Sequence, residues 1–136
     1  MGSRGTYSQK GGFSRQDYRD TGDTIKGFKV IEQIKEGTAT LPQMSNTPGT
    51  VYIFRTRSGE MKIGIYGQDR RITKEIEISH GHRNKYNSGK KQRLKKGVAH
   101  VHNWHRGREN NTRYMTKKEI KIYGKAVLAI GGKLRP

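Results

Sequence analysis

Apolar residues occur in this 136-residue chain as short runs that alternate with polar residues. The clearest case is TVYIFRTR, followed by SGE and then MKIGIYG, which together occupy residues 50 to 67. Alternation with a period of two is typical of β-strands, and a short Gly-containing connection suits a hairpin. Because the first strand carries apolar side chains on both faces, we expect it to be central in a sheet.

Three further segments predict strands. Residues 28 to 34 combine aromatic and β-branched side chains, which favour extended structure. Residues 72 to 82 and 97 to 105 alternate apolar and polar positions. The segment from 41 to 50, LPQMSNTPGT, contains two prolines and a glycine and is expected to be a loop.

One helix is predicted in the last part of the chain. Thr116 and Glu119 have the spacing of a capping box, and Gly124 is typical of the residue that ends a helix. Ala126 to Ile130 then predicts a last buried strand. We therefore expect an α+β fold, with a four- or five-stranded antiparallel β-sheet and one or two short helices.

The composition limits the size of the folded unit. Only 29% of the residues are hydrophobic, so the core must be small. The length suits one domain, which we place at residues 25 to 136, with a basic loop at 83 to 96. Residues 1 to 24 are rich in glycine and show no sustained period, which predicts a flexible basic arm.

The charge indicates the kind of partner. Lysine and arginine total 29 against 11 acidic residues, for a formal net charge of +18. Such a charge favours a polyanion, and we expect nucleic acid, with RNA preferred, over a membrane, because no apolar run approaches a spanning helix. The start of the chain lacks the apolar core of a signal peptide, so a cytoplasmic location is expected. With no cysteine, disulfides and thiolate metal sites are excluded.

All five histidines and the only tryptophan lie between residues 72 and 105. Alternation places His80 and His82 on one strand face with Ile76 and Ile78, and it places His100 and His102 on one face with Val98 and Trp104. Antiparallel pairing about the centre of the basic connection would set His82 opposite His100 and His80 opposite His102. The four imidazoles would then form one cluster.

One interpretation of this cluster is acid and base catalysis on a phosphodiester. The imidazole pKa near 6.5 allows one ring to accept a proton while another donates one. We expect His100 or His102 as the base, His80 or His82 as the acid, and Arg113 as a phosphate clamp with Thr112 as a hydrogen-bond donor beside it. With RNA, the 2′-hydroxyl is the nucleophile, so a metal-independent ribonuclease without a cofactor is the leading hypothesis.

Two alternatives stay open. His80, His82, His100 and His102 could bind Zn, Ni or Fe, although residues 83 to 96 contain no acidic residue of the kind that usually accompanies a cation. The histidines could also be structural, within the surface of a non-catalytic nucleic-acid-binding protein.

The basic residues around the histidines are candidates for binding nucleic acid. Lysine and arginine attract phosphates without reading bases, and aromatic rings stack on bases. The candidates are Arg83, Lys85, Tyr86, Lys90, Lys91, Arg93, Lys95, Lys96, Trp104, Arg106 and Arg108.

The chain also resembles a group of small proteins encoded by prophages and mobile elements of Gram-positive bacteria. The resemblance rests on MGSRGTYSQKGGF, TGDTIKGFKVI, MSNTPGTVYIFRTRSGEMK, HGH, GVAHVHNW and RYMTKKEIKIYG, and it spans most of the chain. It implies an origin in a phage or mobile element and a location in the cytoplasm of a bacterial host cell.

The expected strand order is similar to that of the barnase, EndoU, colicin and RelE-like ribonuclease toxins, in which a helical part precedes a four-stranded antiparallel sheet. This resemblance implies a toxin-like ribonuclease with an immunity or antitoxin partner. It also implies a sheet face carrying histidine together with Arg113 and Thr112.

Overall fold

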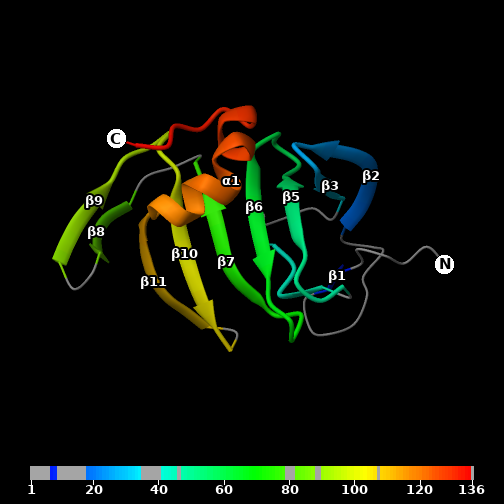
Figure 1. Ribbon diagram of the computed structural model, residues 1–136, viewed down its shortest axis with the longest axis horizontal. Coiled ribbons are helices and arrows are strands. Elements are labelled where there is room, and N and C mark those ends of the chain that lie inside the picture. The colour runs from blue at the N-terminus through cyan, green and yellow to red at the C-terminus, as the bar shows by residue number, and fades with distance from the viewer. Residues whose placement is uncertain are drawn as a thin grey trace.

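The computed structural model describes residues 7–8, 18–34, 41–45, 47–78, 82–87, 90–106 and 108–135 of the chain. In these residues a single helix lies across one face of a seven-stranded sheet (Figure 1). In spatial order the strands are β11 (Arg108–Tyr114), β10 (His100–His105), β7 (Ile72–Glu77), β6 (Met61–Tyr66), β5 (Val51–Arg55), β3 (Phe28–Gln33) and β2 (Tyr18–Ile25), and the helix is α1 (Lys117–Ala129). Two smaller sheets pair β1 (Tyr7–Ser8) with β4 (Met44–Ser45), and β8 (His82–Asn87) with β9 (Lys90–Leu94).

The predicted α+β class, with a mostly antiparallel sheet, is confirmed, but the predicted size of the sheet is wrong. The sheet has seven strands, and β3 pairs with β5 in parallel. The two edge strands, YRDTGDTI and RENNTRY, have few apolar residues. An edge strand is held by main-chain hydrogen bonds to one neighbour, so it needs no alternating apolar pattern that a sequence could reveal.

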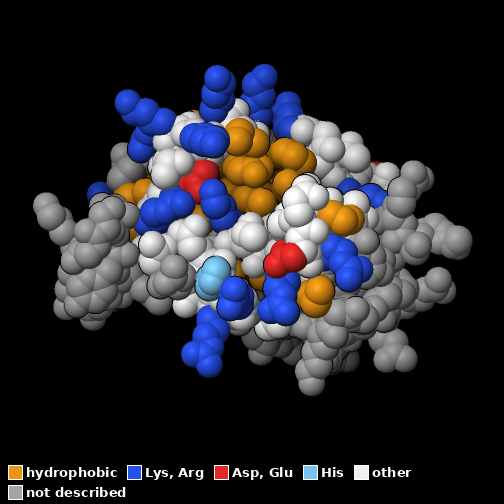
Figure 2. Space-filling view, turned by 60° about the horizontal axis from the view of Figure 1, so that its bottom comes forward, with side chains coloured by type: hydrophobic (Ala, Val, Ile, Leu, Met, Phe, Trp, Pro, Cys, Tyr) orange, Lys and Arg blue, Asp and Glu red, His pale blue; other side chains and the backbone are white. Residues whose placement is uncertain are grey.

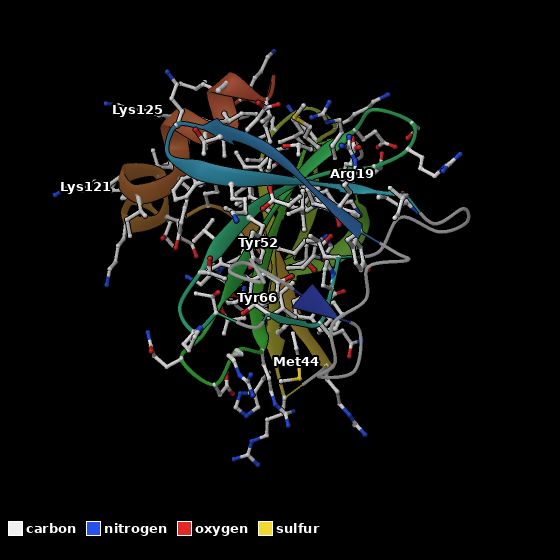
Figure 3. The ribbon with its side chains drawn as sticks, turned by 90° about the vertical axis from the view of Figure 1, so that its right-hand side faces the viewer. Arg19, Met44, Tyr52, Tyr66, Lys121 and Lys125 are labelled. Atoms are coloured by element: carbon white, nitrogen blue, oxygen red, sulfur yellow. The ribbon has the colours of Figure 1, made fainter. Side chains whose placement is uncertain are left out.

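The central strands bury side chains on both faces, as predicted for β5. On the side of α1, Ile53 packs with Val30, Ile63 and Ile76 in what we call the helix-side core. On the other side, the second core contains mainly aromatic side chains. Its buried members are Tyr18, Ile31, Leu41, Tyr52, Phe54, Tyr66 and Ile72, and Tyr52 and Tyr66 are labelled in Figure 3.

The connection between the parallel strands covers the second core. Parallel neighbours need a crossover, and the described part of this one places Leu41 and Pro42 against the sheet. Leu41 occupies the space above Gly64, where a Cβ would lie 3.3 Å from the Leu41 Cδ2 atom. The Tyr66 hydroxyl donates a hydrogen bond to the Pro42 carbonyl oxygen at 2.5 Å. The crossover is therefore a structural layer as well as a connection.

Helix α1 begins as predicted and ends later than predicted. Thr116 and Glu119 form the expected capping box. The predicted stop at Gly124 and the predicted strand at residues 126 to 130 are both wrong, because the helix continues to Ala129. Gly124 is buried inside the helix, so the absence of a side chain there serves packing and not termination. Within the described residues, no helix is long and apolar enough to cross a membrane.

The ordered sheet also begins earlier than the expected boundary at residue 24. β2 starts at Tyr18, whose ring is 5% exposed and contacts Phe54 edge-on with ring centroids 5.6 Å apart. Its pairing with β3 is regular at both ends and shifts in register between Asp20 and Thr24, where Gly22 has a φ of 81°. Residues 18 to 24, assigned to the flexible arm, thus belong to the sheet.

Gly132 lies where the chain passes closely over the sheet after α1. A Cβ at this position would lie 2.6 Å from Ile78 Cγ2 and 2.9 Å from Val127 Cγ1. We expect Gly132→Ala to lower the free energy of unfolding by about 1 to 3 kcal/mol, because the branched side chains of Ile78 and Val127, or the chain that carries them, must shift to make room. Urea denaturation measures this effect. Gly124→Ala is the control: its Cβ would meet Ile120 Cγ2 at 3.3 Å, and alanine favours the helix by about 1 kcal/mol. Equal destabilisation by both changes would contradict the packing argument.

Candidate functional site

Two histidines of β10 lie directly opposite two glutamates of β7. These strands are antiparallel neighbours, with His100 opposite Glu77 and His102 opposite Glu75. The predicted register, which set His82 opposite His100, is wrong. β7 ends at Glu77, and His82 is the first residue of β8 in a separate hairpin.

The register also determines the face on which the histidines lie. His100 pairs with residue 77, whereas the predicted partner was residue 82. The register is therefore shifted by an odd number of residues, which turns the His100 side chain to the opposite face of the sheet. Val101 pairs with Ile76, and both pack in the helix-side core. His100 and His102 therefore point away from α1. The prediction that they share a face with Ile76 and Ile78 is wrong.

The predicted roles of His80 and His82 fall outside what the structure describes, because residue 80 and the side chain of residue 82 are not among the described positions. The prediction of a basic loop at residues 83 to 96 is wrong, because β8 and β9 form a hairpin there. The structure does not describe the side chains of six residues predicted to contact nucleic acid: Arg83, Lys85, Tyr86, Lys90, Lys91 and Arg93.

Adjacent residues of β11 point to opposite faces. Thr112 pairs with His102, and its Oγ1 lies 3.0 Å from His102 Nδ1. Arg113 pairs with Val101, and its guanidinium donates to the two carboxylate oxygens of Glu119 at 2.7 and 2.9 Å. The structure thus brings Thr112 to His102, whereas Arg113 lies on the other side of the sheet and holds the helix.

His102 is the centre of a hydrogen-bonded group on the face away from α1. Its Nδ1 lies 3.1 Å from Glu109 Oε2, and Thr112 donates its hydroxyl hydrogen to that same oxygen at 2.7 Å. On the other side of the ring, Nε2 lies 3.3 Å from Glu77 Oε1. The rings of His100 and His102 meet edge to face with centroids 5.0 Å apart. We call this group the His102 cluster: Glu75, Glu77, His100, His102, Glu109 and Thr112.

The charges in the His102 cluster stabilise one another. Burial lowers the pKa of His102, but its contacts with Glu77 and Glu109 raise that pKa by more, so the net shift is upward. Burial raises the pKa of Glu77, but the hydrogen bond with His102 and the nearby Lys62 bring it well below its usual value. Both shifts favour an imidazolium between carboxylates when no other cation is bound.

Glu75 has the opposite shift. Burial and the hydrogen bond to Glu77 raise its pKa to about 8, so its carboxyl group holds a proton at neutral pH. Lys62 Nζ lies 3.4 Å from Glu75 Oε2 and 3.8 Å from Glu77 Oε1. Two neighbouring carboxyl groups with pKa values shifted apart are a common feature of functional sites, and of structural ion-pair networks as well.

The glutamates are the members of the site that sequence reasoning missed. Glu75 and Glu77 lie on the face of β7 opposite Ile76, where their charge alone would predict exposure to solvent. Both are in fact buried, with 8% and 6% exposure. Glu75 and Glu77 are two residues apart, as are His100 and His102. This matching spacing was the signal in the sequence that could have identified the glutamates as members of the site.

The remaining predicted contacts differ in accessibility. Lys95, Lys96, Arg106 and Arg108 are exposed. Trp104 is partly buried and packs against the second core, so its ring has a structural contact already.

A second basic surface was not predicted: the outer side of α1. We call it the lysine face, and it consists of the exposed residues Lys117, Lys118, Lys121 and Lys125. Glu119, the only acidic residue of the helix, is 3% exposed and faces the sheet. Figure 3 shows Lys121 and Lys125 pointing away from the molecule, and Figure 2 shows lysine and arginine side chains around an apolar patch.

Comparisons with protein-family models, with curated proteins and with solved structures found no match for this chain. The His102 cluster and the lysine face are therefore the features of this protein from which a function can be inferred.

Proposed function

We propose that this protein binds nucleic acid through the phosphate backbone, without reading the base sequence. The observation that carries the proposal is the lysine face. Lys117, Lys121 and Lys125 are spaced by four residues and form one stripe, about 12 Å long at 1.5 Å per residue. A row of ammonium groups on a chain of net charge +18 attracts a polyanion at long range and can contact successive phosphates.

The burial of the imidazoles favours binding over catalysis as the proposal. A general acid or base must come within about 2.6 to 3.2 Å of the proton it transfers. His100 is 0% exposed and His102 is 5% exposed. Arg113 is engaged with Glu119. In this arrangement, the exposed lysines are better placed than the histidines to meet a nucleic acid.

Removing two charges from the lysine face tests the proposal. We expect the double variant Lys121→Ala, Lys125→Ala to bind a labelled oligonucleotide more weakly than the unaltered protein. Fluorescence anisotropy at several salt concentrations gives the slope of log K against log salt. That slope should become shallower by up to about 1.4 for single-stranded RNA and about 1.8 for duplex DNA, because each lost phosphate contact removes about 0.7 or 0.9.

A control variant removes the same formal charge elsewhere. Arg19 and Lys29 form ion pairs with Glu32 and Asp20, and Figure 3 shows Arg19 well away from Lys121 and Lys125. Arg19→Ala, Lys29→Ala should change the salt slope less. If the two double variants lose binding equally, the loss reflects the lower net charge alone, and the proposal that the lysine face is the binding surface is contradicted. Binding to anionic vesicles but not to oligonucleotides would replace nucleic acid by a membrane surface.

A metal-independent ribonuclease is the second candidate, and one observation favours it. Glu109 and Thr112 both contact Nδ1 of His102, as the orienting groups of a catalytic base do. Incubation with RNA in EDTA, followed by a denaturing gel, distinguishes the two candidates. Cleavage that disappears in His102→Gln would support the nuclease, and intact RNA in every lane would leave binding alone.

A further inference from the structure

We propose that Glu77, His100 and His102 form a binding site for a divalent transition-metal ion, of the kind represented by Zn²⁺. One ligand atom from each of these residues lies within 4.8 Å of the others, and all three residues are buried. The distance from His102 Nε2 to Glu77 Oε1 is 3.3 Å. Two ligands of a tetrahedral ion with bonds of about 2.0 Å are separated by about 3.3 Å, so this pair already has the required spacing.

The hydrogen atoms around His102 point to the same conclusion. Thr112 has one hydroxyl hydrogen and donates it to Glu109. At Nδ1 the imidazole must therefore be the donor, toward Thr112 Oγ1 at 3.0 Å or Glu109 Oε2 at 3.1 Å. With Nδ1 protonated, Nε2 is the nitrogen that faces the carboxylate oxygen of Glu77, and it can hold either a proton or a metal ion. A cation between these two atoms, either a proton or a metal ion, makes the contact favourable.

This arrangement also supplies the outer groups that metal sites use. A metal-bound histidine usually donates its second ring N–H to a carboxylate or another acceptor, which fixes the ring and its tautomer. Glu109 and Thr112 hold that position against His102. They lie on β11, the strand next to β10, so the orienting contact comes from the same sheet as the ligands.

The local charge suits a cation although the chain as a whole is basic. Two carboxylates, Glu77 and Glu109, lie against the His102 ring, and Lys62 Nζ lies 3.8 Å from Glu77 Oε1. They are two of 11 acidic residues in a chain of net charge +18. The nearby carboxylates that segment 83 to 96 lacks are thus contributed by β7 and β11. Two imidazole ligands with one carboxylate select zinc-like ions over Mg²⁺ and Ca²⁺, which prefer oxygen.

Cobalt titration of the full chain, purified without a histidine tag and stripped with a chelator, tests the site. We expect Co²⁺ to produce visible d–d absorption that saturates at one ion per chain, Zn²⁺ to abolish it, and Mg²⁺ to have no effect. Zn²⁺ should also raise the melting temperature, because a ligand that binds only the folded state stabilises it. No absorption and no thermal shift would overturn the proposal.

Variants localise the ion. His102→Gln should abolish the cobalt spectrum. Glu109→Gln, at an exposed residue, should weaken binding about 10- to 100-fold without changing the stoichiometry. His105→Gln removes an exposed imidazole from the end of the same strand and should change nothing. If His102→Gln does not fold, two measurements still test the site. They are cobalt binding by the Glu109 variant and the change in the NMR chemical shifts of the histidine ring nitrogens when Zn²⁺ is added to the unaltered protein. Loss of binding in His80→Gln, His82→Gln, with retention in Glu109→Gln, would assign the ion to a different histidine pair.

Discussion

Replacing Glu119 by glutamine is expected to lower the free energy of unfolding by about 3 kcal/mol, because it removes one partner of a buried ion pair. Glu119 is 3% exposed. It accepts hydrogen bonds from Arg113, from Lys74 at 2.7 Å and from the backbone N–H of Thr116 at 2.9 Å. The amide removes the charge that holds Arg113 and Lys74, and it leaves those cations without a counterion between α1 and the sheet.

The destabilisation should depend on pH. Burial raises the pKa of Glu119, but the hydrogen bonds from Arg113 and Lys74 lower it by more, to about 2, from an ordinary value of 4.5. Since the folded pKa is below the unfolded one, the stabilisation is complete above about pH 4.5 and is lost as the pH falls toward 2. The difference between Glu119→Gln and the unaltered protein should therefore shrink over that interval in urea denaturation.

Thr116→Ala is the matched control for this prediction. It removes the other half of the capping box and should cost about 1 kcal/mol. Because the threonine hydroxyl does not titrate, most of that cost should persist at low pH. A Glu119→Gln variant as stable as the unaltered protein at pH 7 would show that the helix does not depend on this carboxylate.

Replacing Leu41 by alanine is expected to cost about 2 to 5 kcal/mol, as for other buried leucines. Leu41 is 3% exposed, packs in the second core and occupies the space above Gly64. Gly64 pairs with Glu75 of the His102 cluster, so the cavity would open beside the buried carboxyl group. Thermal and urea denaturation measure the loss.

Leu128→Ala tests whether any leucine would give the same result. Leu128 is 56% exposed on α1, and its truncation should change stability by no more than about 0.5 kcal/mol. Similar losses in the two variants would contradict the conclusion that the crossover segment forms a packed layer on the sheet.

Strands that contribute to the core could be predicted from the sequence, and strands at the edges could not. β3, β5 and β6 were predicted near their observed bounds because buried strands need an apolar pattern. The polar sequence RENNTRY has no apolar pattern that would predict a strand, and it forms β11 through its pairing with β10. For Ala126 and Val127, helix and strand were equally compatible with a short apolar run, and packing of α1 on the sheet selected the helix.

The candidate site was predicted in part. His100, His102 and Thr112 were selected, and the structure brings them together. The register of β7 against β10 was not predictable, because the chain makes the β8–β9 hairpin between these strands, and the length of such an excursion is not encoded in the strands themselves. An odd error in register exchanges the faces of β10 relative to β7, which is why His100 and His102 were placed with Ile76 instead of with Glu75 and Glu77.

The irregular pairing of β2 has a consequence for how copies of this protein behave at high concentration. An open sheet edge with a regular row of N–H and C=O groups can add a strand from another molecule. β2 occupies such an edge, but its pairing shifts between Asp20 and Thr24, Gly22 adopts a left-handed conformation, and Arg19 and Asp20 carry exposed charges. A bent and charged edge is a poor template for self-association. The irregular and charged β2 thus disfavours the addition of a strand from a second molecule at this edge of the sheet.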